Sequence, residues 1–190
     1  MMKINDVVYK KGVKFGDNLI LTKPLGVQPV MAAYRLLKEE ESLSRELLDE
    51  VPQKAVEEAI EEVISSMTTT NKSVAEAMLQ VKVNAATDVT GFGLVGHASE
   101  MAQQSGVDME ITRMPVFRGS IRISDVLGYS LRDGQAQETA GGMLLSVSQE
   151  NAKQLIKALE KRQVTPYMIG SVKKGKGEVK LSKDPEFIEV

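Results

Sequence analysis

The chain has 190 residues, long enough for a domain with a substantial buried core. Its 24 Lys and Arg residues nearly cancel its 26 Asp and Glu residues, so no global field attracts nucleic acid or an anionic membrane. The lack of cysteine excludes a disulfide scaffold, a thiolate metal site and a cysteine nucleophile in this chain, and the single histidine excludes a multi-histidine metal centre. A metal bound here would therefore be a hard, oxygen-liganded ion such as Mg²⁺.

The hydrophobic residues of the sequence form neither a membrane span nor a signal peptide. No apolar run reaches the ~18 residues of a membrane span, and residues 1–6 lack the apolar core of a signal peptide. We therefore expect a soluble, cytoplasmic protein with no nucleic-acid or membrane partner. Homo-oligomerisation stays open.

The first predicted element is a buried strand over residues 19–21, which Pro24 and Gly26 end. Lys23 stands at the end of this strand. It is either a solvated surface lysine or a side chain that points into a site formed where strands terminate.

Apolar residues at helical spacing predict helices over about residues 28–67, with a break at Ser42 to Ser44. The predicted inner stripe of the second helix consists of Val56, Ala59, Ile60, Val63 and Ile64. Its glutamates fall on the other face and form a solvated surface. Asn71 then caps a short helix over residues 72–80, with Val74, Met78 and Leu79 facing inward.

The centre of the chain predicts a strand over residues 81–86, a helix over 94–104 and a strand over 107–112. If the two strands pair in parallel, these elements form a right-handed crossover unit.

The remaining segment begins with an irregular stretch, residues 115–134, which we expect to be a functional loop or disordered. A strand over 143–147, a helix over 149–161 capped by Ser148, a strand over 167–172, a hairpin turn and an edge strand over 178–181 follow. Alternating strands and helices predict one α/β (α+β) domain over residues 1–190, with a mixed sheet covered by helices.

The most informative stretch lies between the central strand and helix. Gly91-Phe-Gly93-Leu-Val-Gly96 fits the dinucleotide fingerprint, but that pattern alone is a weak signal. In a dinucleotide fold the glycines follow the strand directly, whereas residues 87–90 intervene here. The Asp88 carboxylate would also repel a pyrophosphate unless a cation lay between them. We therefore disfavour this interpretation.

Asp88 suits a phosphate that is bridged through Mg²⁺. Magnesium binds one or two carboxylates and completes its shell with water and substrate phosphates, while a helix N-terminus offers amide donors to phosphate. One carboxylate is too few for tight binding, so the rest of such a site must come from elsewhere. His97 either approaches the phosphates or makes a local hydrogen bond, and Thr87 and Thr90 favour holding the bend through backbone hydrogen bonds.

The eleven residues from Thr87 to His97 (Thr-Asp-Val-Thr-Gly-Phe-Gly-Leu-Val-Gly-His) closely resemble the signature of the C-terminal domain of selenophosphate synthetase (selenide, water dikinase). Further matches occur in the family's order. They are residues 16–26, Asn71, the Thr-Ala-Gly-Gly-Met-Leu segment at 139–144, and Ile169-Gly170. The resemblance spans nearly the whole chain and places it in the superfamily of aminoimidazole ribonucleotide synthetase and hydrogenase-maturation proteins.

The resemblance implies a reaction in which ATP, selenide and water give selenophosphate, AMP and phosphate. It implies that Asp88 is a Mg²⁺ ligand. We expect the residues on the phosphate side of the cofactor site to be Thr87, Thr90, Gly91, Gly93 and His97. The nucleotide-binding carboxylates and the reactive cysteine or selenocysteine belong to an N-terminal ATP-binding half that this sequence lacks, so no catalytic residue is assigned. We expect that half to be the partner, as a domain or a subunit, and expect the chain to be inactive alone.

Two departures leave other functions open. After Gly26 the family usually continues Thr-Gly, whereas this chain has Val27-Gln28; before Thr139 it often has Asp-Pro-Gln, whereas this chain has Ala-Gln-Glu. A relative that uses another substrate, or a stand-alone non-catalytic interaction or regulatory domain, is therefore the alternative.

Overall fold

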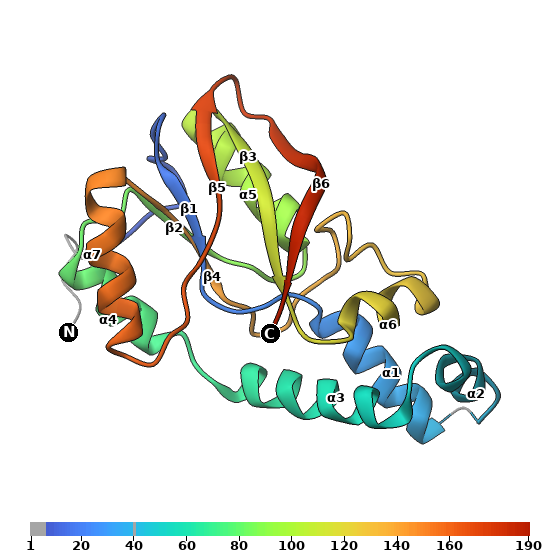
Figure 1. Ribbon diagram of the computed structural model, residues 1–190. Coiled ribbons are helices and arrows are strands. Elements are labelled where there is room, and N and C mark those ends of the chain that lie inside the picture. The colour runs from blue at the N-terminus through green and yellow to red at the C-terminus, as the bar shows by residue number, and fades with distance from the viewer. Residues whose placement is uncertain (1–6, 40) are drawn as a thin grey trace.

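Six strands form one sheet in the computed structural model, which describes residues 7–39 and 41–190 (Figure 1). Met1 to Asp6, on which the signal-peptide expectation partly rests, lie outside the described residues. The strands are β1 (Asn18–Leu21), β2 (Ala85–Asp88), β3 (Val107–Val116), β4 (Met143–Val147), β5 (Tyr167–Lys174) and β6 (Val179–Glu189). Their order across the sheet is β2-β4-β1-β5-β3-β6.

The sheet is mixed. Neighbouring strands pair antiparallel except β3 and β6, which pair in parallel. The α/β fold with a mixed, helix-covered sheet is thus confirmed.

β1 lies in the middle of the sheet and is buried on both faces. Leu19 and Leu21 join one apolar cluster, which includes residues of α5 (Gly93–Ser105), while Ile20 joins a second cluster on the other side. This alternation follows from the period of two in a strand. It also explains why three consecutive apolar residues form a strand here, because both faces of the sheet are covered.

The helices form three groups, two of which cover the faces of the sheet (Figure 1). α5 packs on the face that carries Leu19, and α4 (Lys72–Gln80) packs against α7 (Gln149–Glu160) on the other. The third group extends beyond the sheet and consists of α1 (Val27–Glu39), α2 (Glu41–Glu50), α3 (Gln53–Thr68) and α6 (Ser120–Leu127). A separate apolar cluster, to which Phe117 and Ile123 contribute, holds this third group together.

The condition for the crossover unit is not met, and the predicted hairpin is wrong. The strands on either side of α5 are not neighbours, because β2 lies at one edge and β3 next to the other, so they form no parallel crossover unit. β6 does not return beside β5 as a hairpin partner; it pairs with β3 instead. Local patterns could not reveal this, since strand order depends on distant pairings.

Element boundaries also differ from the expectations. The central strand comprises residues 85–88 rather than 81–86, so Asp88 is its last residue. The stretch 115–134 is not irregular throughout, because it contains the end of β3 and helix α6. The serines at 42 and 44 lie within α2 instead of breaking a helix.

Three of the predicted side-chain roles are wrong too. Leu79 is 57% exposed and Ile64 38% exposed, so neither belongs to the inner face of its helix. Asn71 precedes α4, but its side chain makes no capping hydrogen bond there. Ser148, in contrast, caps α7 as predicted, with its side chain accepting from the Asn151 amide.

Among the described residues, no helix is both long enough and apolar enough to cross a membrane.

Candidate functional site

Asp88 is exposed at the end of β2, where the chain leaves the sheet and turns into α5. We call residues 87–93 the Asp88 bend. Antiparallel pairing of Asp88 with Met143 holds its start, and the Val89 amide donates to the Gly142 carbonyl at 2.9 Å. Strand β2 ends at Asp88, and Thr90 follows two residues later as a half-buried residue of the bend.

The Thr90 carbonyl fixes the bend itself. It accepts from the Gly93 amide and from the Glu138 amide, each at 3.0 Å. Gly93 has a φ of 65°, and a Cβ at this position would lie 2.8 Å from the Ala136 carbonyl oxygen. Only glycine fits there without strain.

The other two glycines of the motif have different surroundings. Gly91 has an ordinary φ and open space where a Cβ would lie, whereas a Cβ at Gly96 would lie 2.6 Å from that of Phe92. Of these three glycines, only Gly93 has a positive φ.

The cofactor-side candidates differ in accessibility. Thr87 is buried and its hydroxyl donates to the Asp88 carbonyl at 3.2 Å, so it supports the bend from inside. The Gly93 amide already has an acceptor in the Thr90 carbonyl. Gly91 is exposed and Thr90 half-buried, which leaves these two beside Asp88 as groups that a ligand can reach.

His97 is buried beneath the bend, with 4% of its surface exposed. Its Nε2 lies 3.1 Å from the Thr90 hydroxyl oxygen and its Nδ1 lies 3.2 Å from a Glu100 carboxylate oxygen. The Phe92 ring lies over it at a centroid distance of 5.5 Å. Of the two interpretations of His97, the structure thus agrees with the one in which it makes local hydrogen bonds.

Lys23 is only 8% exposed, which rules out the solvated interpretation. Its ammonium group donates to three carbonyl oxygens, those of Thr69 at 2.6 Å, Ala140 at 2.7 Å and Ser66 at 2.8 Å. Burial lowers the pKa of this amine. The lysine at the end of β1 therefore connects the C-terminus of α3 to the segment that precedes β4.

Glu138 is a buried carboxyl group that no sequence pattern indicated. It is 4% exposed, and its oxygens accept from the Gly26 amide at 2.8 Å and the Val27 amide at 3.1 Å, at the N-terminus of α1. Burial raises its pKa to about 8, although the two backbone donors act in the opposite direction. Its partners lie more than a hundred residues earlier, so no local motif could have identified it.

Residues 138–142 connect the bend to the helices. The Asn71 side chain donates to the Gly141 carbonyl at 2.9 Å, and its own amide oxygen is buried without a partner among the described residues. Together with the contacts of Glu138 and Gly142, this segment fixes the Asp88 bend relative to α1, α3 and α4.

A metal at the bend would have one carboxylate. Among residues 7–39 and 41–190, no group of three or more His, Cys, Asp or Glu side chains lies close enough to hold an ion. The exposed carboxylate of Asp88 is a hard oxygen donor, which suits Mg²⁺ but leaves most of its shell to water and other ligands.

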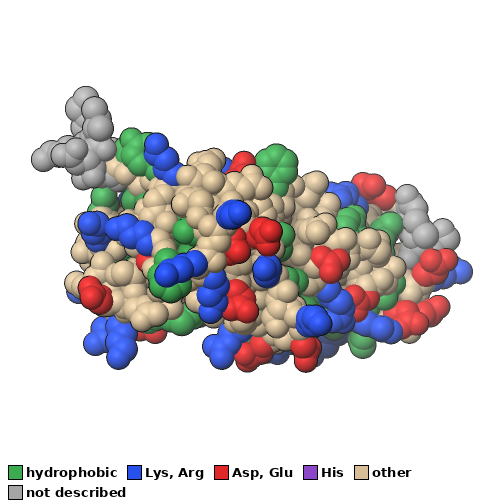
Figure 2. Space-filling model, turned by 90° about the horizontal axis from the view of Figure 1, so that it is seen from above, with side chains coloured by type: hydrophobic (Ala, Val, Ile, Leu, Met, Phe, Trp, Pro, Cys, Tyr) green, Lys and Arg blue, Asp and Glu red, His purple; other side chains and the backbone are tan. Residues whose placement is uncertain are grey.

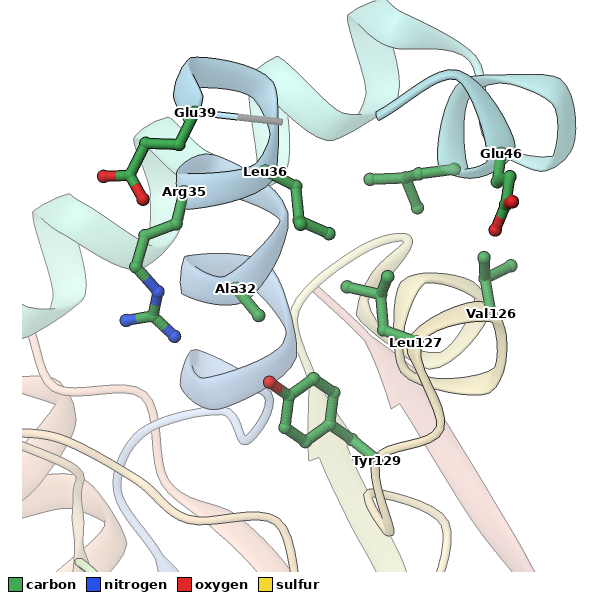
Figure 3. Close-up of a pocket in the computed structure, with 9 residues that line it drawn as sticks. Ala32, Arg35, Leu36, Glu39, Glu46, Val126, Leu127 and Tyr129 are labelled. Carbon is green, nitrogen blue, oxygen red and sulfur yellow. The ribbon is translucent and has the colours of Figure 1, made fainter. Parts of the chain in front are cut away.

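A pocket of about 450 Å³ lies away from the bend. It is lined by residues of α1 such as Ala32 and Arg35, by residues of α2, and by Leu127 and Tyr129 at the end of α6 and just after it (Figure 3). None of its lining residues belongs to the Asp88 bend. On the face shown in Figure 2, basic and acidic side chains are interspersed, as the nearly balanced composition suggests.

Comparison with known proteins gives relationships over almost the whole chain. The family model described as AIR synthase related protein, C-terminal domain, matches residues 14–182. A selenide, water dikinase of Methanocaldococcus jannaschii is 40% identical over 97% of this chain and 54% of its own length. Selenide, water dikinase 2 of Homo sapiens is 30% identical over 98% of this chain and 43% of its own length.

Solved structures show the same fold at lower identity. Hydrogenase maturation protein HypE in complex with ATP has a TM-score of 0.72 at 18% identity, covering 95% of this chain and 51% of that chain. Thiamine-monophosphate kinase from Stenotrophomonas maltophilia has a TM-score of 0.68 at 18% identity, covering 96% and 55%. In each comparison, the chain spans about half the length of the protein that it matches.

Proposed function

Since the chain belongs to the family of AIR synthase related proteins, C-terminal domain, we propose that it forms the C-terminal half of a selenide, water dikinase-type enzyme. The proposed reaction converts ATP, selenide and water to selenophosphate, AMP and phosphate. The remaining half would supply the nucleotide site and the reactive selenium or sulfur group. The observation that carries the proposal is the 40% identity to a selenide, water dikinase over 97% of this chain but only 54% of that protein.

In this proposal Asp88 contributes one ligand to Mg²⁺, and Thr90 and Gly91 lie on the phosphate side. Magnesium supplies charge neutralisation to the phosphates of ATP. In this chain, the Thr90 carbonyl accepts hydrogen bonds from the Gly93 and Glu138 amides and so holds the bend that carries Asp88. The position of the bend would therefore set where the metal ion binds. A fixed donor is effective since it needs no reorganisation during the reaction.

The only support for ATP as a cofactor comes from proteins that share the fold. A hydrogenase maturation protein with the same fold has been solved in complex with ATP, and a thiamine-monophosphate kinase shares it as well. This chain covers 51% and 55% of those two proteins, and we propose that the nucleotide site requires residues outside this sequence. We accordingly propose that this chain by itself does not turn over ATP.

The test joins the chain to the N-terminal half of the Methanocaldococcus jannaschii relative in one polypeptide. We expect selenide-dependent formation of AMP from ATP by the fusion and none by this chain alone. Asp88→Asn should lower the rate about a hundredfold, the loss typical of a displaced charge-stabilising group. Asp184→Asn is the matched control, since Asp184 is an exposed carboxylate on β6.

Two results would contradict the proposal. One is robust ATP hydrolysis by this chain without the added half. The other is a folded fusion that forms no AMP, or whose rate is unaffected by Asp88→Asn; that outcome would favour the alternative, a stand-alone interaction or regulatory domain or a relative that uses another substrate.

A further inference from the structure

Phe92 is an exposed aromatic residue within the Asp88 bend. It is 68% exposed and occupies the N-cap position of α5, where its side chain makes no capping hydrogen bond. Serine, threonine, aspartate and asparagine are preferred at this position because their side chains accept from the first amides of the helix, which a phenylalanine cannot do. A residue that departs from such a local preference is expected at a functional site.

The first turn of α5 holds the Phe92 ring in position. The ring centroids of Phe92 and buried His97 lie 5.5 Å apart. A Cβ on Gly96 would lie 2.6 Å from that of Phe92, so the glycine permits this close approach. An aromatic ring whose position is already set loses little conformational entropy when it is covered by a partner. Phe92 therefore has the properties of an anchor for protein contact.

Exposure alone would not single out this residue, because single exposed apolar side chains are common on protein surfaces. Phe15 is 61% exposed as well. The Lys174 ammonium lies 5.3 Å from the centroid of the Phe15 ring, so this ring has a cationic partner inside the chain. Phe92 differs from Phe15 in lying at the start of a helix and within the candidate site.

Residues 7–13, which precede β1, run along the outer edge of β2. The Ala86 amide donates to the Tyr9 carbonyl at 3.0 Å, and a Cβ on Gly12 would lie 2.7 Å from the Asn84 carbonyl oxygen. Followed backward from Gly12 to Tyr9, the segment passes from Asn84 to Ala86, in the direction of Asp88. It therefore leads toward the end of the sheet that carries the bend.

An ion pair between this segment and α5 lies close to the ring. The Lys10 ammonium lies 2.9 Å from a Glu100 carboxylate oxygen, and each side chain is 38% exposed. The same oxygen lies 3.2 Å from Nδ1 of His97, whose ring contacts Phe92. An apolar centre that is bordered by charged, partly exposed groups is the usual composition of a protein interface.

The comparisons indicate which partner covers this surface. The match to the Methanocaldococcus jannaschii relative covers 97% of this chain but 54% of that protein. The matching family model is a C-terminal domain, and its match begins at residue 14, directly after the segment that leads toward the bend. The half that precedes such a domain would thus enter on the side of the molecule where Phe92 is exposed.

We propose that Phe92 is the anchor through which the N-terminal half of the enzyme docks onto the Asp88 bend, with the Lys10–Glu100 ion pair at the border of the contact. Covering the ring removes a large apolar surface from water, which favours docking. The inference rests on the proposed function, which supplies that half as the partner. It adds the surface and the residue through which the two halves meet.

The first experiment compares the isolated chain with its fusion to the N-terminal half of the Methanocaldococcus jannaschii relative, by hydroxyl-radical oxidation of side chains and mass spectrometry. Oxidation of Phe92 should be about fivefold slower in the fusion, because the centre of an interface excludes water. Phe15 is the internal control and should keep its rate within about twofold. It precedes the Asn18 end of β1, whereas Asp88 lies level with the opposite end, near Leu21.

The second experiment uses Phe92→Ser, for which a docking role and a structural role predict opposite results. Serine supplies the capping hydroxyl that phenylalanine lacks, so the isolated variant should unfold at the same urea concentration as the wild type or at a higher one. In the wild-type fusion, the backbone amides of residues 90–95 should exchange with solvent more slowly than in the isolated chain. Phe92→Ser should abolish this difference, and Phe15→Ser, the matched control, should retain it.

Several results would overturn the inference. One is equal oxidation of Phe92 in the chain and the fusion, and another is slow exchange that persists in the Phe92→Ser fusion. A lower urea midpoint of the isolated Phe92→Ser chain would assign the ring to the stability of α5. Protection of Phe92 that grows with the concentration of the isolated chain would assign the surface to a second copy, and protection that requires ATP would assign it to the nucleotide.

These outcomes are separate from failure of the proposed function. A fusion that forms AMP from ATP while Phe92 stays as accessible as in the isolated chain contradicts the inference only. A fusion that forms no AMP, but in which Phe92 is protected and Phe92→Ser restores fast exchange, contradicts the proposed function only.

Discussion

At the scale of single residues, burial of Glu138 makes the stability of the fold depend on pH. Its pKa of about 8 lies above the ordinary value of 4.5 because the side chain is buried. The folded protein therefore binds more protons than the unfolded chain between these two values, and stability should fall as pH rises through this range.

This behaviour gives a direct prediction. The free energy of unfolding of the wild type should decrease between about pH 5 and pH 8, by up to roughly 1.4 kcal/mol per pH unit. Glu138→Gln removes the titrating group, so the free energy of unfolding of this variant should not show that decrease with pH. Urea unfolding followed by circular dichroism at several pH values would measure it. Parallel pH dependence in the two proteins would show that Glu138 titrates normally.

The glycines of the bend give a second residue-scale prediction. Gly93→Ala should lower the free energy of unfolding by about 1 to 3 kcal/mol, because alanine is strained at positive φ and its Cβ would press on the carbonyls around Ala136. Gly91→Ala is the matched control and should change stability by less than about 0.5 kcal/mol, since its surroundings are open. Equal losses in thermal or urea unfolding would contradict this assignment.

At the scale of elements, Lys23 connects β1 to the C-terminus of α3. A helix leaves its last carbonyls without partners inside the helix, and here Lys23, two residues after β1, donates to the carbonyls of Ser66 and Thr69. The same ammonium holds Ala140 in the segment before β4. One residue thus orders the third group of helices against the sheet.

Removing that ammonium should be costly. Lys23→Met keeps the length of the side chain but removes the donor of the Thr69 and Ala140 carbonyls, while the Ser66 carbonyl keeps the Thr69 amide, and we expect a loss of about 2 to 4 kcal/mol in the free energy of unfolding. Lys54→Met is the control because Lys54 is a solvent-exposed residue of α3. Similar unfolding curves for both variants would mean that water replaces the lost donor.

Elements with strong local patterns could be predicted from the sequence. The strand at Leu19, the helix after Ser148 and the helix that follows the Asp88 bend were all correct, because apolar spacing and capping residues act within a few positions. α6 was missed, since it is short and lies among glycines at 119, 128 and 134. The partner of β6 was missed because pairing with β3 leaves no local trace.

At the scale of the whole molecule, the site was predictable only in part. The Asp88 motif is contiguous, so its residues could be named from the sequence, and their roles remain predictions. The surroundings of Lys23 and Glu138 depend on partners brought together by the fold. The buried link between Thr90 and Glu100 lay within eleven residues, yet it became visible only once the turn of α5 placed His97 under the bend.

The order of strands has a further consequence, for how the chain folds. Leu19 of the central strand pairs with Ser146 on one side and with Gly170 on the other. The middle strand is thus synthesised well before the two strands that flank it in the sheet. Such distant pairings slow folding, and unpaired strand edges favour aggregation. Both edges of β1 therefore stay without their sheet partners until β4 and β5 have been synthesised.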